Sequence, residues 1–161
     1  MEALTIRPIG FIRTPHKTQE GTPIQPSAAK DVEGTIEILP EFRDALADVQ
    51  GFERLWLIYW FDRAKSFRPR VIPYRDTVER GLFATRAPSR PNPLGLSCVR
   101  LVEVSVEAGT LRLLDVDLLD GTPIIDIKPY VSQYDSFPNS KGGWHEQSDS
   151  SRLSADDRFQ K

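Results

Sequence analysis

The sequence contains few of the residues that form covalent or metal cross-links. Its 161 residues include one cysteine, Cys98, one methionine and two histidines, His16 and His145. A single cysteine forms no internal disulfide, which is usual for proteins of the cytoplasm. Because protein zinc sites need several cysteine or histidine ligands, we expect no metal site. Cys98 lies within an apolar run, and we interpret it as a small core residue.

Long hydrophobic runs are also absent. No apolar segment approaches the roughly 20 residues of a membrane-spanning helix, so no membrane partner is expected. The first residues, M-E-A-L-T-I-R, lack the basic patch and apolar core of a secretory signal. We therefore expect the protein to be cytoplasmic.

Several motifs of nucleotide-binding proteins and hydrolases are missing. There is no G-x-G-x-x-G after a strand and no Walker A sequence, which argues against Rossmann-type dinucleotide or methyl-donor sites and against P-loop sites. Residues 95–99, G-L-S-C-V, lack the second glycine of a nucleophile elbow. A hydrolase that uses Ser97 with His16 is therefore disfavoured.

The overall composition is that of an ordinary globular domain. Hydrophobic residues make up 39% of the chain, charged residues make up 27%, and the net charge is −2. This balance argues against a protein covered in cations for nucleic-acid binding. Residues 63–90, however, carry eight basic side chains and two acidic ones. That local excess fits a phosphate-binding face and a solvated arginine-rich loop equally well.

Alternating apolar residues and turn residues predict a mainly β domain. Strands are expected over residues 4–12, 34–39, 55–61, 80–85, 96–106, 111–118 and 124–127. Pro40 begins a short amphipathic helix in which Phe42, Leu46 and Val49 recur at helical spacing. Many short strands with one helix favour a β-sandwich or a β-barrel.

Some of these segments predict more than a strand. Residues 55–61, L-W-L-I-Y-W-F, are apolar on both faces, which predicts burial on both sides or a subunit contact. Asp120-Gly121 is typical of a hairpin turn. Residues 139–161 are rich in Ser, Asp and Gly and are expected to form a mobile or peripheral polar tail, after a barrel domain over residues 1–138.

Alternation within the strand expected over 96–106 predicts its two faces. One face would carry Cys98, Val102, Val104 and Val106, and the other would carry Val99 and Leu101.

The loop over residues 86–93, R-A-P-S-R-P-N-P, combines two arginines with three prolines. Proline fixes φ and donates no backbone hydrogen bond, so we predict a stiff loop between two strands. A preset loop loses little conformational entropy when it binds a ligand, and the arginine fork suits carboxylates and phosphates. Weak surface ion pairs are the alternative role for these arginines.

This loop and four further segments resemble the TsaA-like family of tRNA N6-methyltransferases, often called TrmO. The similar segments are I-G-F-I-R-T-P-H-K at 9–17, Gln25-Pro26, G-F-x-R-L-W-L-I-Y-W-F at 51–61, F-A-T-R-A-P-x-R-P-N-P-L-G-L-S at 83–97 and D-L-L-D-G-T-P-I-I-D-I-K-P-Y at 117–130. They follow the family's order over most of the chain. The resemblance implies a single-domain β-barrel with one short helix and long loops.

The resemblance also implies a methyl donor, S-adenosylmethionine, and the residues that bind it. The implied donor site consists of Gln25, Pro26, Ser27, Phe61, Asp62, Arg86, Leu96, Leu114, Asp115, Val116 and Asp117. In this interpretation Arg86 binds the carboxylate of the donor, and the Phe61 ring stacks on the donor. Backbone groups between Leu114 and Asp117 meet the adenine edge.

The implied acceptor is N6 of threonylcarbamoyladenosine, next to the anticodon of tRNA. We predict that Arg90, Asn92 and Lys128 bind the modified base or a phosphate. Because the acylated nitrogen is a weak nucleophile, Asp126 or Tyr130 is predicted to assist the loss of its proton. The alternative is a structural ion pair between Asp126 and Lys128.

Two other functions stay open at this point. One is an enzyme of the same fold that binds S-adenosylmethionine but has a different acceptor. The other is a β-barrel that binds or regulates without catalysis. Because the chain is shorter than the bacterial relatives, we also expect a homodimer, with strand 55–61 as its contact.

Overall fold

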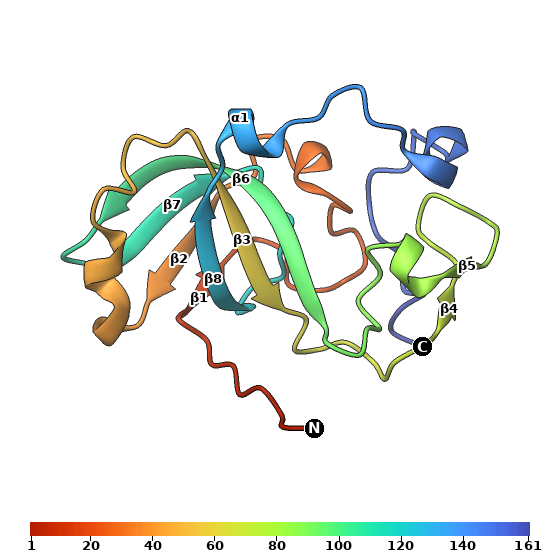
Figure 1. The fold of residues 1–161 in the computed structure, drawn as a ribbon, viewed down its shortest axis with the longest axis horizontal. Helices are drawn as coiled ribbons and strands as arrows, with labels where there is room; N and C mark the ends of the chain where they lie inside the picture. The colour runs from red at the N-terminus through yellow and green to blue at the C-terminus, as the bar shows by residue number, and fades with distance from the viewer.

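The computed structural model describes residues 1–161 and has a closed six-stranded barrel at its centre (Figure 1). The strands are β1 (Gly10–Arg13), β2 (Gly34–Ile38), β3 (Arg54–Trp60), β6 (Leu94–Ser105), β7 (Thr110–Leu114) and β8 (Pro123–Pro129). They follow the order β1, β2, β7, β6, β3, β8 around the barrel, and β8 pairs with β1 to close it. All neighbours are antiparallel. The predicted mainly β, single-domain barrel is confirmed.

Alternate side chains of these strands fill the barrel. Ile12, Ile36, Leu57, Leu111 and Ile124 are fully buried in one apolar core. A closed barrel leaves no sheet edge open, so these short strands are stabilised by pairing on both sides.

Strand β3 buries one of its two apolar faces. Leu55, Leu57 and Tyr59 point into the barrel, whereas Trp60 at the end of the strand is 43% exposed. Within this chain the prediction of burial on both faces is therefore wrong. The outer face pairs Trp60 with Leu94 of β6 in register and remains available to another surface.

Two predicted strands are shorter than the sequence pattern suggested. The first begins at Gly10, and Leu4 and Ile6 before it are exposed. The strand expected over 80–85 is the two-residue β5 (Arg80–Gly81), followed by a 3-10 helix over Leu82–Ala84. β5 pairs with β4 (Arg70–Val71) outside the barrel.

Two predictions for the second half of the chain also need correction. β7 ends at Leu114 instead of residue 118, because Asp115 adopts a φ of 65° that a strand cannot contain. Asp120-Gly121 is a turn but not a hairpin, since β7 and β8 are not neighbours in the barrel.

A bulge in β6 changes which residues face the core. The register with β7 shifts between Leu101 and Glu103, so Val104 packs against the same core as Val99. The prediction that these two valines lie on opposite faces is therefore wrong.

The helices are short. The segment expected to be an amphipathic helix is a 3-10 helix over Pro40–Leu46, and further 3-10 helices span Pro26–Ala28 and Gly143–Gln147. The one α-helix, α1, spans Ser132–Asp135. None of these helices has the length and apolar character needed to cross a bilayer.

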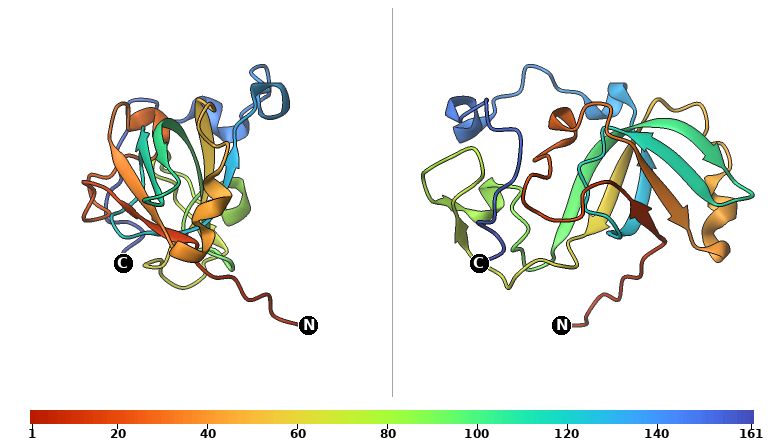
Figure 2. Two further views of the ribbon diagram at one scale, coloured as in Figure 1. Left: turned by 90° about the vertical axis from the view of Figure 1, so that its left-hand side faces the viewer. Right: turned by 180° about the vertical axis from the view of Figure 1, so that it is seen from behind.

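Residues 61–93 and 139–161 form a side lobe beside the barrel (Figure 2). Its small core consists of Val71, Leu82, Ala87 and Phe159, with Tyr74 packed against it. The segment after residue 139 is therefore fixed to the lobe through buried residues. Its division from the barrel domain at residue 138 remains a prediction.

Candidate functional site

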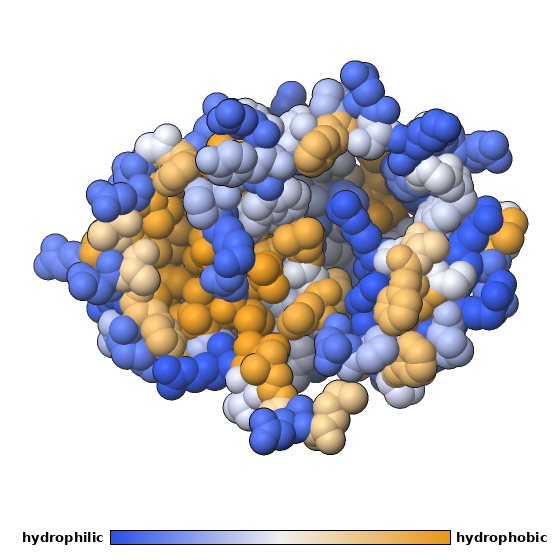
Figure 3. All heavy atoms as spheres, viewed as in Figure 1, coloured by the Kyte–Doolittle hydropathy of each residue, from blue (hydrophilic) through white to orange (hydrophobic).

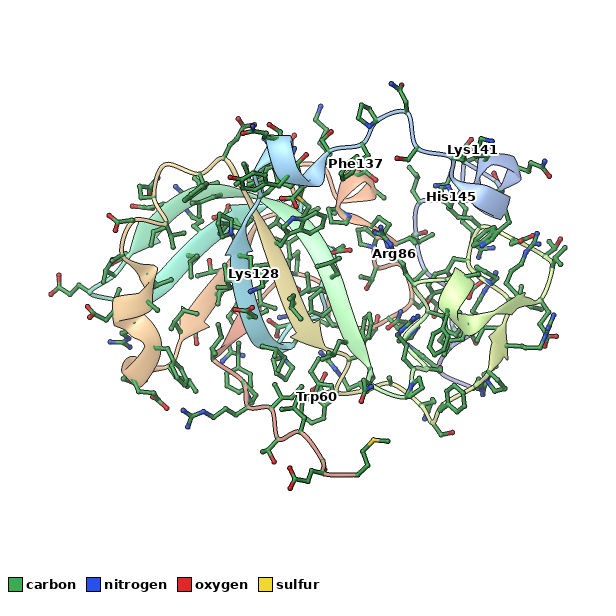
Figure 4. The ribbon with its side chains drawn as sticks, in the orientation of Figure 1. Trp60, Arg86, Lys128, Phe137, Lys141 and His145 are labelled. Atoms are coloured by element: carbon green, nitrogen blue, oxygen red, sulfur yellow. The ribbon has the colours of Figure 1, made fainter.

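A cavity of about 680 Å³ lies where the barrel meets the side lobe, and we call it the first chamber. Its walls come from the loop before β2, from the ends of β3 and β6, and from the side lobe. Of the predicted site residues, those that line it are Gln25, Phe61, Asp62, Arg86, Arg90, Leu96 and Asp117. Figure 4 shows Arg86 between the barrel and the side lobe.

Three polar side chains form a hydrogen-bonded chain along one wall of the first chamber. The Ser97 hydroxyl donates to Oδ1 of Asp117 at 2.7 Å. The Tyr59 hydroxyl lies 3.1 Å from Ser97 Oγ. Because Ser97 spends its one proton on Asp117, Tyr59 must be the donor of this second bond. Ser97 and Tyr59 are both buried, so the chain fixes the orientation of the carboxylate.

Burial raises the pKa of Asp117 to about 7, although the Ser97 hydrogen bond and the nearby Arg86 charge oppose the shift. Burial also raises the pKa of Tyr59, so its hydroxyl keeps its proton at physiological pH. Asp117 therefore changes charge near neutral pH and can give or take a proton there.

Gly95 makes room for this hydrogen-bonded chain. It lies opposite Tyr59 in the β3–β6 register. A Cβ atom on Gly95 would lie 2.2 Å from the Tyr59 ring. Glycine at this position lets the ring lie flat across β6 and reach Ser97.

Arg86 connects the proline-rich loop to the loop before β2. Its Nη1 donates to Oε1 of Gln25 at 2.7 Å. Its Nε and Nη2 have no acceptor within the protein, and it forms no ion pair. A guanidinium with free donors at a cavity wall can bind an anionic group bidentately.

One aromatic side chain, Phe61, and one acidic side chain, Asp62, also line the first chamber. The Phe61 ring packs edge-on against Tyr59, with 5.3 Å between ring centroids. Asp62 pairs with Arg63 at 3.3 Å, and Arg63 Nη2 also donates to the backbone oxygen of Asp120 at 3.0 Å. The first chamber thus combines an aromatic ring, Phe61, with two carboxylates. Arg63 partly balances the charge of Asp62, and Arg86 partly balances that of Asp117.

Arg90 stabilises the proline-rich loop from within. Its Nη1 lies 2.9 Å from the Thr85 oxygen, 3.3 Å from the Ala87 oxygen and 3.5 Å from the Leu82 oxygen. These carbonyl contacts indicate a structural role for Arg90. Its predicted role in ligand binding stays a prediction. Asn92 is exposed and lines neither this cavity nor the one beside it.

The residues before Asp117 serve the fold. Asp115 accepts hydrogen bonds from Arg100 at 2.7 Å and from the backbone of Asp31 at 2.9 Å. The Arg100 hydrogen bond holds the pKa of Asp115 below its usual range. Leu114 ends β7 and Val116 is fully buried, and none of these three residues lines the cavity. Pro26 and Ser27 also do not line the first chamber.

The structure does not bring Asp126, Lys128 or Tyr130 to the cavity. They lie on or just beyond β8, where Lys128 Nζ pairs with Asp126 Oδ2 at 2.9 Å. The Tyr130 ring packs against Trp56 with centroids 5.8 Å apart. In Figure 4, Lys128 projects over the barrel, away from Arg86. The structural alternative for the Asp126–Lys128 pair is thus the observed geometry.

Sequence reasoning missed several residues of the first chamber. Tyr59 looked like an ordinary member of an apolar strand, and Tyr74 and Phe159 looked like isolated residues. Ser97 does not line the chamber but bonds to Tyr59 and Asp117, and the sequence suggested it only for a disfavoured hydrolase. The pairing of Tyr59 on β3 with Gly95 on β6, which gives the ring its space, is visible only in the fold.

The match to a known family follows the same segments. The family model of the tRNA-methyltransferase O N-terminal domain matches residues 11–136. The chain belongs to this family. The match covers the barrel except for Gly10 at the start of β1, includes the proline-rich loop, and ends before the C-terminal part of the side lobe.

Relatives of this tRNA-methyltransferase O family member support the assignment. A probable S-adenosyl-L-methionine-binding protein of Pyrococcus abyssi is 53% identical over 140 residues, which are 87% of this chain and 75% of that protein. A tRNA (adenine(37)-N6)-methyltransferase of Escherichia coli is 35% identical over 152 residues, with 89% of this chain and 65% of that protein covered. The chain therefore spans about two thirds of the Escherichia coli enzyme.

A solved structure has the same fold. The crystal structure of TrmO from Pseudomonas aeruginosa matches 88% of this chain and 62% of its own, with a TM-score of 0.74 and 38% identity. This family member thus has the same fold as an experimentally determined relative.

Proposed function

We propose that this protein transfers a methyl group from S-adenosylmethionine to N6 of an adenine in tRNA. The observation that carries the proposal is the first chamber. It places a guanidinium with free donors, an aromatic ring and a carboxylate around one volume, in a chain similar to a tRNA (adenine(37)-N6)-methyltransferase.

The residues of the first chamber fit the methyl donor. Its volume of about 680 Å³ lies within the range of about 300–1,000 Å³ typical of small-molecule sites. Arg86 would hold the carboxylate of the donor, and Phe61 would pack on its adenosine. The carboxylates of Asp117 and Asp62 would lie in the volume that holds the cationic sulfonium. The carboxylate and the sulfonium of the donor would thus each meet a group of opposite charge.

Bound S-adenosylmethionine supplies a methyl group on an electrophilic sulfonium. The task of the chain is then to align the acceptor nitrogen with that methyl group and to exclude water. The Tyr59–Ser97–Asp117 hydrogen-bonded chain supports alignment, because each member is held by the next.

We infer that Asp117 is the proton acceptor. As the carbon–sulfur bond of the donor breaks to leave a neutral thioether and the methyl carbon bonds to N6, the nitrogen must lose one proton, and the ionised Asp117 carboxylate would accept it. Asp117 lines the chamber and has a pKa of about 7, which suits this task. The assignment to Asp126 or Tyr130 made from the sequence stays a prediction that the same experiment tests.

The experiment compares three substitutions in methyl transfer to tRNA. Asp117→Asn is expected to lose turnover with saturating donor, whereas Asp126→Asn and Tyr130→Phe are expected to keep it. Calorimetry with S-adenosylmethionine reports donor binding separately. Full turnover of Asp117→Asn would contradict its role as proton acceptor, and absence of donor binding by the unaltered protein would refute the whole proposal.

The acceptor is tested by mass spectrometry of nucleosides from tRNA. Incubation of the protein with S-adenosylmethionine and tRNA is expected to add one methyl group to an adenosine derivative. If the modified nucleoside carries a threonylcarbamoyl group, the finer prediction from the sequence is confirmed. Donor binding without methylated RNA would instead favour a different acceptor.

We further propose that the protein is a cytoplasmic homodimer. A tRNA substrate supports the location. On the face seen in Figure 3 apolar side chains gather over the barrel, and Trp60 at the end of β3, which does not line the first chamber, is 43% exposed. Such a patch is typical of a protein contact. Sedimentation of Trp60→Glu tests this, because a dimer formed by this face is expected to dissociate.

A further inference from the structure

A second chamber of about 610 Å³ lies beside the first. The two share the Arg86–Gln25 pair, together with Ile24, Tyr74, Thr85 and Phe159. Arg86 therefore lies in the wall between two volumes and has free donors for both. A ligand in one chamber is next to any ligand in the other.

The second chamber is cationic. Its lining includes Arg75, Arg86, Arg152 and His145 and contains no aspartate or glutamate. Arg152 pairs with Asp156 at 2.6 Å, whereas Arg75 and Arg86 form no ion pair. Their charges are only partly balanced, by Asp149 near Arg75 and by Asp117 near Arg86. Two guanidiniums with free donors in one volume indicate an anionic ligand.

Arg75 is held in place by a backbone oxygen and a histidine nitrogen, and it forms no ion pair with a carboxylate. Its Nε donates to the backbone oxygen of Asp149 at 2.9 Å, and its Nη1 lies 3.3 Å from His145 Nε2. Arginine can only donate, so His145 Nε2 must be the acceptor of this bond. Nη2 of Arg75 remains without a protein acceptor.

The second chamber also has aromatic walls. Trp144 Nε1 donates to the Ala84 oxygen at 2.7 Å, which fixes the indole, and Arg80 covers one ring face with 5.4 Å to the centroid. Phe83 at the rim is 79% exposed. Guanidiniums next to exposed aromatic rings are the combination that binds the phosphates and bases of single-stranded nucleic acid.

Much of this chamber lies outside the part of the chain that the family model matches. Trp144, His145, Arg152 and Phe159 follow residue 136, where the match ends. In Figure 4, His145 lies in the side lobe, and Arg86 lies between it and the barrel. The C-terminal segment thus adds a basic, aromatic wall to the barrel.

We propose that the second chamber binds the RNA strand that carries the acceptor adenine, with Arg75 and Arg86 on a phosphodiester next to that adenine and Phe83 and Trp144 beside the adjoining base. This inference rests on the proposed function, because an adenine that enters the first chamber brings its flanking phosphate to the shared wall.

The test measures the affinity of a fluorescent anticodon stem-loop RNA for the full chain at several salt concentrations. Arg75→Gln is expected to weaken RNA binding about 5- to 20-fold and to reduce the slope of log affinity against log salt by about 1, as for one lost phosphate contact. Phe83→Ala is expected to weaken binding about 5-fold without changing this slope. Donor affinity by calorimetry should be unchanged in both.

Arg112→Gln is the matched control, since it removes one positive charge from an exposed position on β7 that lines neither chamber. Its RNA affinity is expected to stay within about 2-fold of the unaltered protein, because its charge is far from the bound strand. If Arg75→Gln and Phe83→Ala bind RNA as Arg112→Gln does, the proposal is refuted while methyl transfer to tRNA, measured separately, can still succeed. If the unaltered protein binds no RNA, both proposals fail.

Adenosine monophosphate as a competitor identifies a different source of the same chemistry. Binding of this nucleotide that depends on Arg75, combined with RNA affinity that does not, would assign the chamber to a free nucleotide and overturn the RNA proposal.

Discussion

At the scale of single residues, Asp117 determines what the first chamber can do. A carboxylate that is largely shielded from water normally needs a charged partner, yet the half-buried Asp117 has a serine hydroxyl at 2.7 Å and no ion pair. The protein therefore keeps a carboxylate whose proton is lost near pH 7 instead of near pH 4. Such a group weakens the fold at high pH and is useful for proton transfer.

The first prediction concerns the pH dependence of turnover. With saturating donor and RNA, the rate is expected to rise as Asp117 ionises and to level off above pH 7, because only the carboxylate accepts a proton. Asp117→Asn is expected to lower kcat by about 10²–10⁴-fold and to remove this rise. Asp126→Asn is the control and should keep the profile of the unaltered protein. A rise that persists in Asp117→Asn would show that another group titrates.

The second prediction concerns stability. The pKa of Asp117 is raised from 3.8 to about 7, so the folded state holds a proton that the unfolded chain loses near pH 4. The resulting stabilisation is full below pH 4 and is lost as the pH rises through 7. Asp117→Asn carries no such charge and is expected to gain about 1–4 kcal/mol relative to the unaltered protein between pH 4 and pH 8. Urea unfolding at both pH values measures this, and a constant difference would contradict it.

At the scale of elements, the β3–β6 pair and the proline-rich loop position the site. The β3–β6 register places Tyr59 opposite Gly95 and Leu57 opposite Ser97. The loop then enters β6 at Leu94, so the strand that carries Ser97 also anchors Arg86. Errors in this pair would displace both ends of the site.

The third prediction is that Gly95→Ala disturbs this pair. The new Cβ would lie 2.2 Å from the Tyr59 ring, so the ring must shift and lose its bond to Ser97. We expect a loss of about 1–3 kcal/mol in the free energy of unfolding. Gly81→Ala is the matched control, because its Cβ meets nothing within 4 Å. Equal stability of the two variants would contradict the crowding at Tyr59.

The fourth prediction is that Arg90→Lys loosens the proline-rich loop. A lysine cannot reproduce the planar guanidinium that directs Nη1 at the oxygens of Thr85 and Ala87 while it lies 5.6 Å from the centroid of the Phe83 ring. We expect a loss of about 1–2 kcal/mol in stability and weaker donor binding, since Arg86 moves with the loop. Calorimetry and urea unfolding check both. Arg70→Lys, in an exposed ion pair, should change neither, and weaker RNA binding with normal stability would favour direct ligand contact by Arg90.

The sequence predicted these elements where one interaction dominates. Alternation located β2, and the apolar residues 55–61 located β3, because the barrel core requires them. The run Leu82-Phe83-Ala84 misled, because three apolar residues after a glycine form a 3-10 turn as readily as a strand. The bulge in β6 and the positive φ of Asp115 depend on partners across the barrel, which periodicity cannot reveal.

The site was predicted in part for the same reason. Resemblance identified Arg86, Phe61 and Asp117, which do line the first chamber. It could not separate Asp115, held by Arg100, from Asp117 two residues later, since both are acidic residues in an apolar context. The contribution of residues after 139 depends on two isolated apolar residues, Ala155 and Phe159, that gave no pattern.

At the scale of the whole molecule, the chain has two cores and its chambers lie between them. The barrel core contains thirteen buried residues and the lobe core four. The smaller core joins residues 71–87 to Phe159. Backbone hydrogen bonds also join the C-terminal segment to the loop before β2, at Thr22 and Ile24. The barrel should therefore stay folded under conditions in which the side lobe opens.

The fifth prediction follows from this asymmetry. Phe159 is 7% exposed and packs edge-on against Tyr74 with centroids 4.9 Å apart. Phe159→Ala is expected to remove about 3–5 kcal/mol of local packing. Hydrogen exchange should then rise in residues 70–90 and 142–159, with little change in β2 and β7. Leu111→Ala, in the barrel core, should instead raise exchange throughout. Uniform exchange in Phe159→Ala would mean that barrel and lobe unfold as one unit, and the C-terminal wall of the second chamber would then be as rigid as the barrel itself.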